Sequence, residues 1–315
     1  MKEVNVLKTK NNTISGKKGR KVRSGYLNRT GYLFISPFLI GFFALTLFPI
    51  LYSFYLSFTD FDLLGKANWI GFENFSRMFS EDKLYVKSLK VTFLYAGIGV
   101  PIRLVFALIV ALALNKVLEM VGLYRTLLYL PSIVGGSIAI SIMWRQLFGN
   151  DGAVNAILES IGLPTFSWLG DPKLAIWTLI ILYGWQFGSS MLIFLAGLRN
   201  IPQTYYEASS VDGAGPVRQF FVITIPLLTP VILFNTVMQV INGFMAFTPS
   251  FVVTEGGPIN STLLYVLYMY RRAFEYFDMG YASAMAWVML LIIAFFTALI
   301  FKSSSHWVHY ESEDG

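Results

Sequence analysis

The chain lacks cysteine entirely and is poor in charged residues and histidine. Without cysteine, disulfides, thiolate nucleophiles and cysteine metal sites are excluded. Charged residues make up 13% of its 315 residues, whereas an ordinary soluble domain has about 25%. The two histidines, His306 and His309, lie near the C-terminus, and an HxxH pair alone supplies fewer ligands than a zinc site requires. The sequence therefore predicts no metal site.

Motifs of catalysis and of ion coupling are missing as well. No GxxxxGK[ST] phosphate loop occurs, so the chain is not expected to hydrolyse a nucleotide by itself. No arrangement of serine, histidine and aspartate resembles a catalytic triad, and we predict no catalytic residue, no enzyme activity and no cofactor bound by this chain. The long apolar runs hold no carboxylate, although proton- and sodium-coupled carriers usually hold one there. This weighs against the alternative interpretation, a secondary sugar carrier driven by an ion gradient.

Long apolar runs dominate what is present, since 55% of the residues are hydrophobic. A helix needs about 20 consecutive apolar residues to cross a bilayer, and six segments satisfy this. The sequence predicts an all-α integral membrane protein with one membrane domain over residues 31–302, between a basic tail (1–30) and a short C-terminal tail (303–315). The expected spans are residues 31–58, 89–115, 126–148, 173–198, 224–248 and 281–302.

The positive charge gathers before the first span, where Glu3 is the only acid among nine lysines and arginines. The positive-inside rule then places the N-terminus in the cytoplasm, and an even number of spans returns the C-terminus there. Binding of the tail to anionic lipid is a second interpretation. Arg271 and Arg272 fall on the outer side against the rule, close to Glu275 and Asp278, which are expected to offset them.

Two segments between spans have helical patterns. On the outer side, apolar residues at helical spacing predict a short amphipathic helix over residues 153–161. On the inner side, Asn200 is expected to cap a helix that has Pro202 in its first turn and runs to Val211. Residues 212–215, DGAG, would end it, and Pro216 would start a second helix. We therefore predict a helix–turn–helix at the cytoplasmic surface, whose small, aromatic and acidic residues are typical of a protruding docking surface.

This inner segment resembles a known signature. Glu207-Ala208-Ser209, then Gly213, then ITIP at 223–226, match the EAA motif of the membrane subunits of binding-protein-dependent ABC importers. Ser209 stands where that motif usually has alanine, and Ile225 stands where it usually has leucine. The resemblance extends over about residues 30–302. FPILYSFYLSFTDFDL, WIGFENF and TEGGPINSTLLYVLYMYRRAFEYFDMGYASAMAWV are similar to the maltose-type and glycerol-phosphate-type carbohydrate permeases.

The resemblance implies the type I ABC importer permease fold, with six transmembrane helices and a cytoplasmic coupling helix between spans 4 and 5. The implied assembly lies in a bacterial cytoplasmic membrane. It contains a second homologous permease, two cytoplasmic ATPase subunits that bind ATP and magnesium, and an extracellular solute-binding protein that the outer helix would contact. The implied cargo is a carbohydrate, expected to be an oligosaccharide. The ATPase would dock on the loop 200–220, at Tyr206, Glu207, Ala208, Ser209, Asp212, Gly213 and Ala214.

The resemblance also implies a substrate site near the bilayer midplane, at Trp185, Gln186, Ser189, Gln239, Asn242, Gly243 and Ala246. The residues agree in part, because the side chains of Gln186, Gln239 and Asn242 are polar within apolar spans and could bond sugar hydroxyls. Hydrogen bonding between helices is the other use of such side chains. Trp185 and Phe244 could stack on a sugar ring. Arg103, a charge within the second span, is interpreted as a structural residue bonded to carbonyls, with a substrate role as the alternative.

Overall fold

The computed structural model describes residues 24–63, 65–116, 121–134 and 136–309. Within these ranges the regular structure is helical, and strand pairing is limited to two isolated bridges. The chain divides into two compact units, residues 1–52 and 53–315, which are described separately below. The basic segment before residue 24 and the last six residues lie outside the described ranges, so the expected functions of these tails stay predictions.

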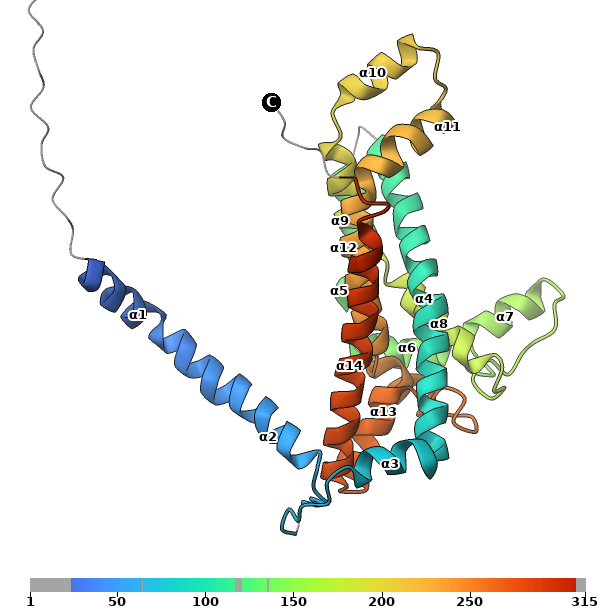
Figure 1. Cartoon of the computed structure of the whole chain (residues 1–315). Coiled ribbons are helices and arrows are strands. Elements are labelled where there is room, and N and C mark those ends of the chain that lie inside the picture. Colours follow the sequence, from blue (N-terminus) through green and yellow to red (C-terminus); the bar gives the residue numbers. More distant parts are fainter. Residues whose placement is uncertain (1–23, 64, 117–120, 135, 310–315) are drawn as a thin grey trace, which may run out of the picture. The chain divides into compact units, whose positions relative to one another are not determined.

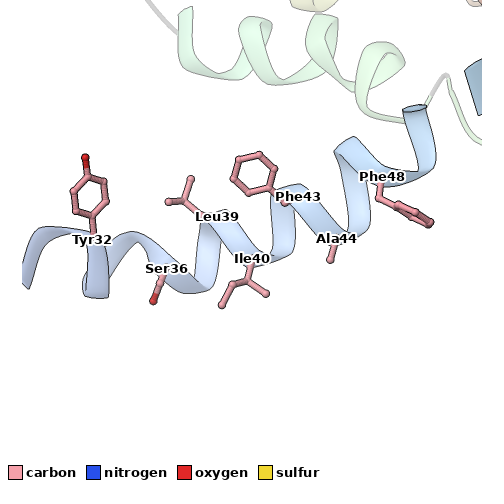
Figure 2. A pocket seen from close by; sticks show the side chains of 7 residues that line it. All are labelled: Tyr32, Ser36, Leu39, Ile40, Phe43, Ala44 and Phe48. Atoms are coloured by element: carbon pink, nitrogen blue, oxygen red, sulfur yellow. The ribbon is translucent and has the colours of Figure 1, made fainter. Parts of the chain in front are cut away.

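The described part of the first unit is one continuous helix made of α1 (Ser24–Gly41), η1 (Phe42–Leu47) and the start of α2 (Phe48–Leu56). From Gly31 to Leu56 it is long and apolar enough to cross a membrane. Its large side chains project in several directions and stay exposed, and they form only a shallow apolar hollow along the helix (Figure 2). Such a surface matches lipid or another apolar helix rather than water.

The second unit is built around α4 (Lys83–Lys116), which packs against α8 (Ala175–Trp185), α9 (Gly188–Asn200) and α12 (Ile225–Phe244) (Figure 1). The core of this unit lies along these contacts. A further long helix, α14 (Met279–Ser304), packs against α12 and closes the bundle. The other helices of this unit are α3 (Glu73–Ser80), α5 (Val121–Val134), α6 (Ile138–Leu147), α7 (Ala153–Ser160), α10 (Gln203–Val211), α11 (Pro216–Gln219), η2 (Phe220–Thr224), η3 (Ser250–Thr254), α13 (Tyr265–Tyr270) and η4 (Arg271–Glu275).

Among the described residues, five helical segments are long and apolar enough to span a membrane, and a bent pair makes the sixth. The pair is α5 and α6, which meet at 96° within the span that was expected over residues 126–148. A new helix starts at the bend, because Ser137 caps α6 by accepting a hydrogen bond from the backbone nitrogen of Ile140 (3.3 Å). Pro131 in the last turn of α5 also removes a backbone donor just before the bend.

The expected amphipathic helix at 153–161 is present as α7. A single buried side chain holds it against its return segment. The Asn155 amide donates to the carbonyl oxygens of Asn150 (2.9 Å) and Phe166 (2.8 Å), and it accepts from the indole of Trp168 (2.9 Å). Because this amide is 3% exposed and fully bonded, the α7 hairpin is a rigid projection from the side of the bundle (Figure 1).

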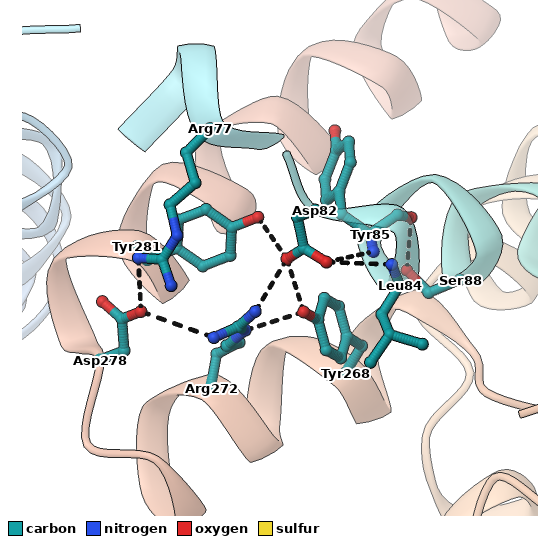
Figure 3. A network of polar contacts seen from close by, with 9 residues as sticks. All are labelled: Arg77, Asp82, Leu84, Tyr85, Ser88, Tyr268, Arg272, Asp278 and Tyr281. Atoms are coloured by element: carbon teal, nitrogen blue, oxygen red, sulfur yellow. Dashed lines mark hydrogen bonds and ion pairs between the residues drawn. The ribbon is translucent and has the colours of Figure 1, made fainter. Parts of the chain in front are cut away.

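The end of the bundle at α3 carries a buried polar network around Asp82 (Figure 3). One Asp82 oxygen accepts from the backbone nitrogens of Leu84 and Tyr85 (both 3.0 Å) and so caps the start of α4. The other accepts from the hydroxyls of Tyr268 (2.5 Å) and Tyr281 (2.7 Å) and pairs with Arg272 at 3.0 Å. One carboxylate thus ties α4 to α13, η4 and α14.

Arg271 and Arg272, whose expected outer position does not follow the positive-inside rule, both have acidic partners. Arg271 pairs with Glu275 (3.6 Å), and Arg272 pairs with Asp278 (3.8 Å), as the sequence suggested. The closest acid to Arg272 is nonetheless Asp82, which lies 190 residues away in sequence. The positive charges are therefore neutralised within the fold, which explains their place outside the general charge pattern.

We predict that Asp82→Asn lowers the free energy of unfolding by about 2–3 kcal/mol, because it leaves the half-buried Arg272 without its closest charge. Burial opposes the ionised carboxylate, but hydrogen bonds from Tyr268 and Tyr281 and the charge of Arg272 outweigh it and hold the pKa of Asp82 below its ordinary value of 3.8. Because the pKa of Asp82 is lower in the folded than in the unfolded protein, ionised Asp82 stabilises the fold when the pH lies above this ordinary value. This contribution should be complete above about pH 5 and disappear as pH falls below 3.8.

Thermal unfolding of the detergent-purified protein measures both effects. Asp151→Asn, a loss of charge at an exposed loop position, is the control and should unfold like the wild type. Equal midpoints for Asp82→Asn and Asp151→Asn at pH 7 would contradict the prediction.

Candidate functional site

The loop at 200–220 forms two short helices at the end of the bundle opposite to α3 (Figure 1). The expected helix–turn–helix is therefore present, as α10 and α11. The expected cap is wrong, however, because Asn200 is the last residue of α9 and Pro202 occupies the N-cap position of α10 without a side-chain hydrogen bond. The fourth span continues as a helix up to Asn200, so the chain becomes extended only at Ile201 and Pro202.

The turn between the two helices depends on Gly213, whose φ of +80° lies in the left-handed region. The backbone nitrogen of Ala214 returns to the Ser209 carbonyl (2.9 Å), which closes the end of α10. Pro216 occupies the first turn of α11, as expected. The glycine is required here because other residues enter this backbone region at a cost.

Most of the residues expected to dock an ATPase face outward. Glu207, Ala208, Asp212 and Gly213 are exposed, and α10 has no buried residue. Val211, at its C-terminal end, is 88% exposed. A helix with no buried side chain gains little from packing within this chain, so α10 has the character of a surface that another chain covers.

Tyr206 has a different position from its neighbours, because it is half-buried and its hydroxyl lies 2.9 Å from the hydroxyl of Thr224. A glutamine that the sequence analysis did not single out, Gln219, donates from its amide to the Tyr206 carbonyl and to the hydroxyls of Ser209 and Ser210. These four contacts hold α10 against the start of the fifth span. The only feature of the sequence that points to Gln219 is its position, one residue before the apolar run.

The second group of expected residues surrounds a break in the fourth span. α8 ends at Trp185, α9 begins at Gly188, and the Gln186 carbonyl left by the break accepts a hydrogen bond from the Ser132 hydroxyl (2.8 Å). The same hydroxyl accepts from the backbone nitrogen of Ser189 (3.1 Å). Ser132 of α5 therefore bridges both sides of the break. Backbone groups that lose their partners within a membrane helix need another hydrogen-bond partner in the protein, and Ser132 supplies one.

A buried chain of polar contacts crosses the bundle beside this break. The Tyr183 hydroxyl donates to the Gln239 carbonyl at 2.9 Å, and the guanidinium of Arg103 lies 4.6 Å from the centre of the Tyr183 ring. Arg103 also donates to the Ser189 hydroxyl at 3.4 Å. None of the ion pairs between described residues includes Arg103. The interior position of Arg103 was expected, but its partners are a hydroxyl and a ring face rather than carbonyls.

The other expected substrate residues lie in different surroundings. Gly243 is buried where α12 meets α4, and a Cβ there would lie 3.2 Å from the Ala96 Cβ and 3.3 Å from Val100. Its small size therefore has a packing reason. Trp185 lies beside Trp144, with ring centres 5.9 Å apart, and is half-buried, as is Ala246. Asn242 is exposed on α12. Their contact with a substrate stays a prediction.

Phe244 is not placed to stack on a sugar within this chain. It is 5% exposed, and its ring lies between those of Phe93 (5.1 Å) and Phe296 (5.6 Å). At the α10 end, His306 contacts Ser305 and His309 contacts the Trp307 carbonyl. Over the residues that the structure describes, no group of three or more metal-ligating side chains lies together.

Comparison with known proteins identifies this arrangement. The family model described as "binding-protein-dependent transport system inner membrane component" matches residues 86–306, which include every helix from α5 to α14 and nearly all of α4. The chain belongs to this family. It is thus a multi-pass membrane permease subunit and not an enzyme. The α10 loop and the broken fourth span both lie within the matched region.

Individual relatives extend the match to almost the whole permease. The probable ABC transporter permease protein YesP of Bacillus subtilis (strain 168) is 56% identical over 309 residues, which cover 97% of this chain and 99% of YesP. The lactose transport system permease protein LacF of Rhizobium radiobacter is 36% identical, covering 89% and 95% of the two chains. A chain of a solved bacterial alginate ABC transporter, in complex with an alginate pentasaccharide-bound periplasmic protein, has a TM-score of 0.78 at 21% identity, with 89% and 95% covered. Its likeness confirms the type I permease fold.

We predict that Gly188→Ala impairs the permease, whereas Gly184→Ala is tolerated. A Cβ at Gly188 would lie 2.7 Å from the Leu128 carbonyl oxygen and 2.8 Å from the Ser132 hydroxyl, which would force α5 away from the break. Such overpacking typically costs about 1–3 kcal/mol. A Cβ at Gly184 would meet only a methyl group of Ile102 at 3.4 Å. The measurement is thermal stability of the two purified variants, and equal losses would show that the close approach at Gly188 is unimportant.

Proposed function

We propose that this permease is the membrane subunit of an ATP-driven importer for a carbohydrate, in the size range of an oligosaccharide. The proposal rests on the exposure of α10, which carries the EAA signature and has no buried residue. Hydrogen bonds fix this helix to the start of the fifth span. Relatives named for lactose and for arabinooligosaccharides support the class of cargo.

In this mechanism a separate ATPase binds ATP and magnesium and docks on α10 through Glu207, Ala208, Ser209 and Asp212. Closure of two ATPase subunits on ATP draws the two coupling helices together, one from this chain and one from a second, homologous permease. Because α10 is bonded to the fifth span, its displacement is transmitted to helices that line the transport path. The cavity then opens outward, and hydrolysis resets it. In this scheme the permease catalyses no reaction. Closure of the ATPase dimer switches it between an inward-facing and an outward-facing state.

The proposed orientation places the α10 end in the cytoplasm and the end carrying α3, α7 and α13 outside. The basic N-terminal segment supports it through the positive-inside rule. A rigid α7 hairpin with Ile157 61% exposed would then face a solute-binding protein, which is the natural source of the sugar. The location is a bacterial cytoplasmic membrane, with both termini inside.

We propose that the sugar is recognised beside the break in the fourth span, by Gln186 and Ser189, and by Asn242 on α12. All three are accessible in part within this chain, whereas Gln239 is 3% exposed and bonded to Tyr183. Trp185 supplies an aromatic face next to these groups. Gln239 and Gly243 then act behind the site, by fixing α12 against α8 and α4. No observation favours a carrier driven by an ion gradient.

Single cysteines test the orientation and the docking together, because the natural chain has none. Val211→Cys on α10 and Ile259→Cys at the other end replace residues that are 88% and 77% exposed. In intact cells an impermeant maleimide should label Ile259→Cys, and it should label Val211→Cys only after permeabilisation. A bifunctional thiol reagent should then join Val211→Cys, but not Ile259→Cys, to the ATPase. Labelling of Val211→Cys from outside would exclude docking on α10.

Coupling is measured as ATP hydrolysis in proteoliposomes that contain both permeases and the ATPase. We expect stimulation by the binding protein when it is loaded with one member of a panel of lactose, arabinooligosaccharides and alginate oligosaccharides. Gly213→Pro should abolish the stimulation, since proline cannot adopt the φ of +80° found there. Glu207→Ala should weaken it. Sugar uptake that persisted without ATPase and followed an ion gradient would overturn the proposal.

A further inference from the structure

One positive charge lies inside the bundle without an acidic partner among the described residues. Arg103 is in the apolar middle of α4, well away from the lysines at both ends of that helix, and it is 7% exposed. A charge in such a place is costly unless an opposite charge and hydrogen bonds compensate it. The position of Arg103 therefore calls for a specific partner.

The contacts of Arg103 within this chain compensate its charge only weakly. The guanidinium lies 4.6 Å from the centre of the Tyr183 ring and donates to the Ser189 hydroxyl at 3.4 Å, while its Nε atom is buried without a hydrogen-bond partner. The distance to Ser189 exceeds the usual range for such bonds, about 2.7–3.2 Å. Neither partner carries a negative charge. The guanidinium therefore keeps the capacity to bind an anion.

Arg272 shows how this chain compensates an arginine that holds the fold together. Arg272 is half-buried, and it pairs with the Asp82 carboxylate at 3.0 Å. Its Nε atom donates to the Tyr268 hydroxyl at 2.8 Å. Arg103 is buried more deeply, yet no carboxylate of the described residues pairs with it and its Nε atom stays unbonded. The difference indicates that the anion for Arg103 comes from outside this chain.

The hydroxyl that Arg103 contacts belongs to the proposed sugar site. Ser189 is half-buried on the second half of the broken span, and Trp185 lies at the end of the first half. A sugar beside the break would contact Ser189 and, through it, face the guanidinium. Tyr183 fixes the charge at this place, because the Tyr183 hydroxyl is itself bonded to the Gln239 carbonyl at 2.9 Å.

We propose that Arg103 binds a carboxylate of the transported sugar, so that the cargo is an acidic oligosaccharide with uronic acid units. This inference rests on the proposed function and assigns the chemical class of its cargo. The planar guanidinium has paired N–H donors that match the two oxygens of a carboxylate. The carboxylate replaces the Ser189 hydroxyl as the acceptor, and this hydroxyl then donates to a carboxylate oxygen. A neutral sugar leaves the buried charge unpaired and is disfavoured for that reason.

Matched pairs of sugars test the proposal in proteoliposomes that contain both permeases and the ATPase. Each pair is an acidic oligosaccharide, from alginate, hyaluronan or polygalacturonate, and its carboxyl-reduced form, which keeps the length and linkages but has no charge. The binding protein is saturated with each sugar, so that a difference in uptake arises at the permease. For the wild type we expect uptake of the acidic member to be at least about tenfold faster, the effect of one hydrogen-bonded charged contact.

Variants of Arg103 should change this ratio of acidic to reduced sugar. Arg103→Gln keeps a donor without the charge, so its ratio should fall to about one. Arg103→Lys keeps the charge without the paired donors and should retain part of the preference. Arg145→Gln, which removes an exposed arginine of α6, is the control and should keep the wild-type ratio. Because two sugars are compared within each variant, a general loss of folding or activity does not alter the ratio.

The outcomes separate this inference from the proposed function. If lactose, arabinooligosaccharides or the reduced sugars are taken up as well as the acidic ones, the inference is wrong and the proposed function stands. The same holds if Arg103→Gln keeps the wild-type ratio. If Arg103→Gln separates the two permeases during purification, the anion belongs to the second permease, which also overturns the inference. If no loaded binding protein stimulates the complex, the proposed function itself fails.

Discussion

The close approach of three helices to α4 is the constraint on which the bundle depends. Ala96, Val100, Arg103, Ala107 and Ala111 lie on one stripe of α4, at the spacing of a helix face, and all are buried. Small side chains let other backbones come near, which in a membrane replaces the hydrophobic effect as the main source of helix association. The glycines that face α4 complete these contacts, since a Cβ on Gly243 of α12 would lie only 3.2 Å from the Ala96 Cβ, a tight contact. Loss of this surface would separate the helices that carry both the break and the loop 200–220.

Polar groups then fix the relative orientation of the helices, which apolar packing alone does not determine. Arg103 lies within the α4 stripe and reaches Tyr183 on α8 and Ser189 on α9, so a single side chain sets the rotation of two half-helices around the break. Asp82 does the same at one end of α4, where its carboxylate gathers two tyrosines and an arginine. The hydrogen bonds from Gln219 to α10 do so at the other end of the unit. Each of these networks contains a polar group that is costly to leave without a hydrogen bond. Each network therefore favours one arrangement of the helices over alternative arrangements.

The two halves of the proposed function depend on opposite physical properties. Docking needs an exposed helix that keeps its shape without a core, and α10 achieves this through hydrogen bonds with α11 and η2 rather than through burial. Passage of a sugar needs polar groups at the middle of an apolar bundle, and the break at Gln186 and Phe187 provides them from the backbone as well as from side chains. The fifth span belongs to both regions, since Thr224 and Gln239 lie on the same helix.

The amino-acid sequence alone was enough to predict the apolar spans, the position of the loop 200–220 and the absence of catalytic motifs. These features are local, because a span depends on consecutive apolar residues and the turn after α10 depends on Gly213 and its neighbours. The folded structure was needed to find the 96° bend between α5 and α6, the aromatic ring that Arg103 contacts, and the contacts of Asp82, Ser132 and Gln219. Asp82 and Arg272 are 190 residues apart. A pairing of this kind depends on how the helices pack, which no single stretch of the sequence contains.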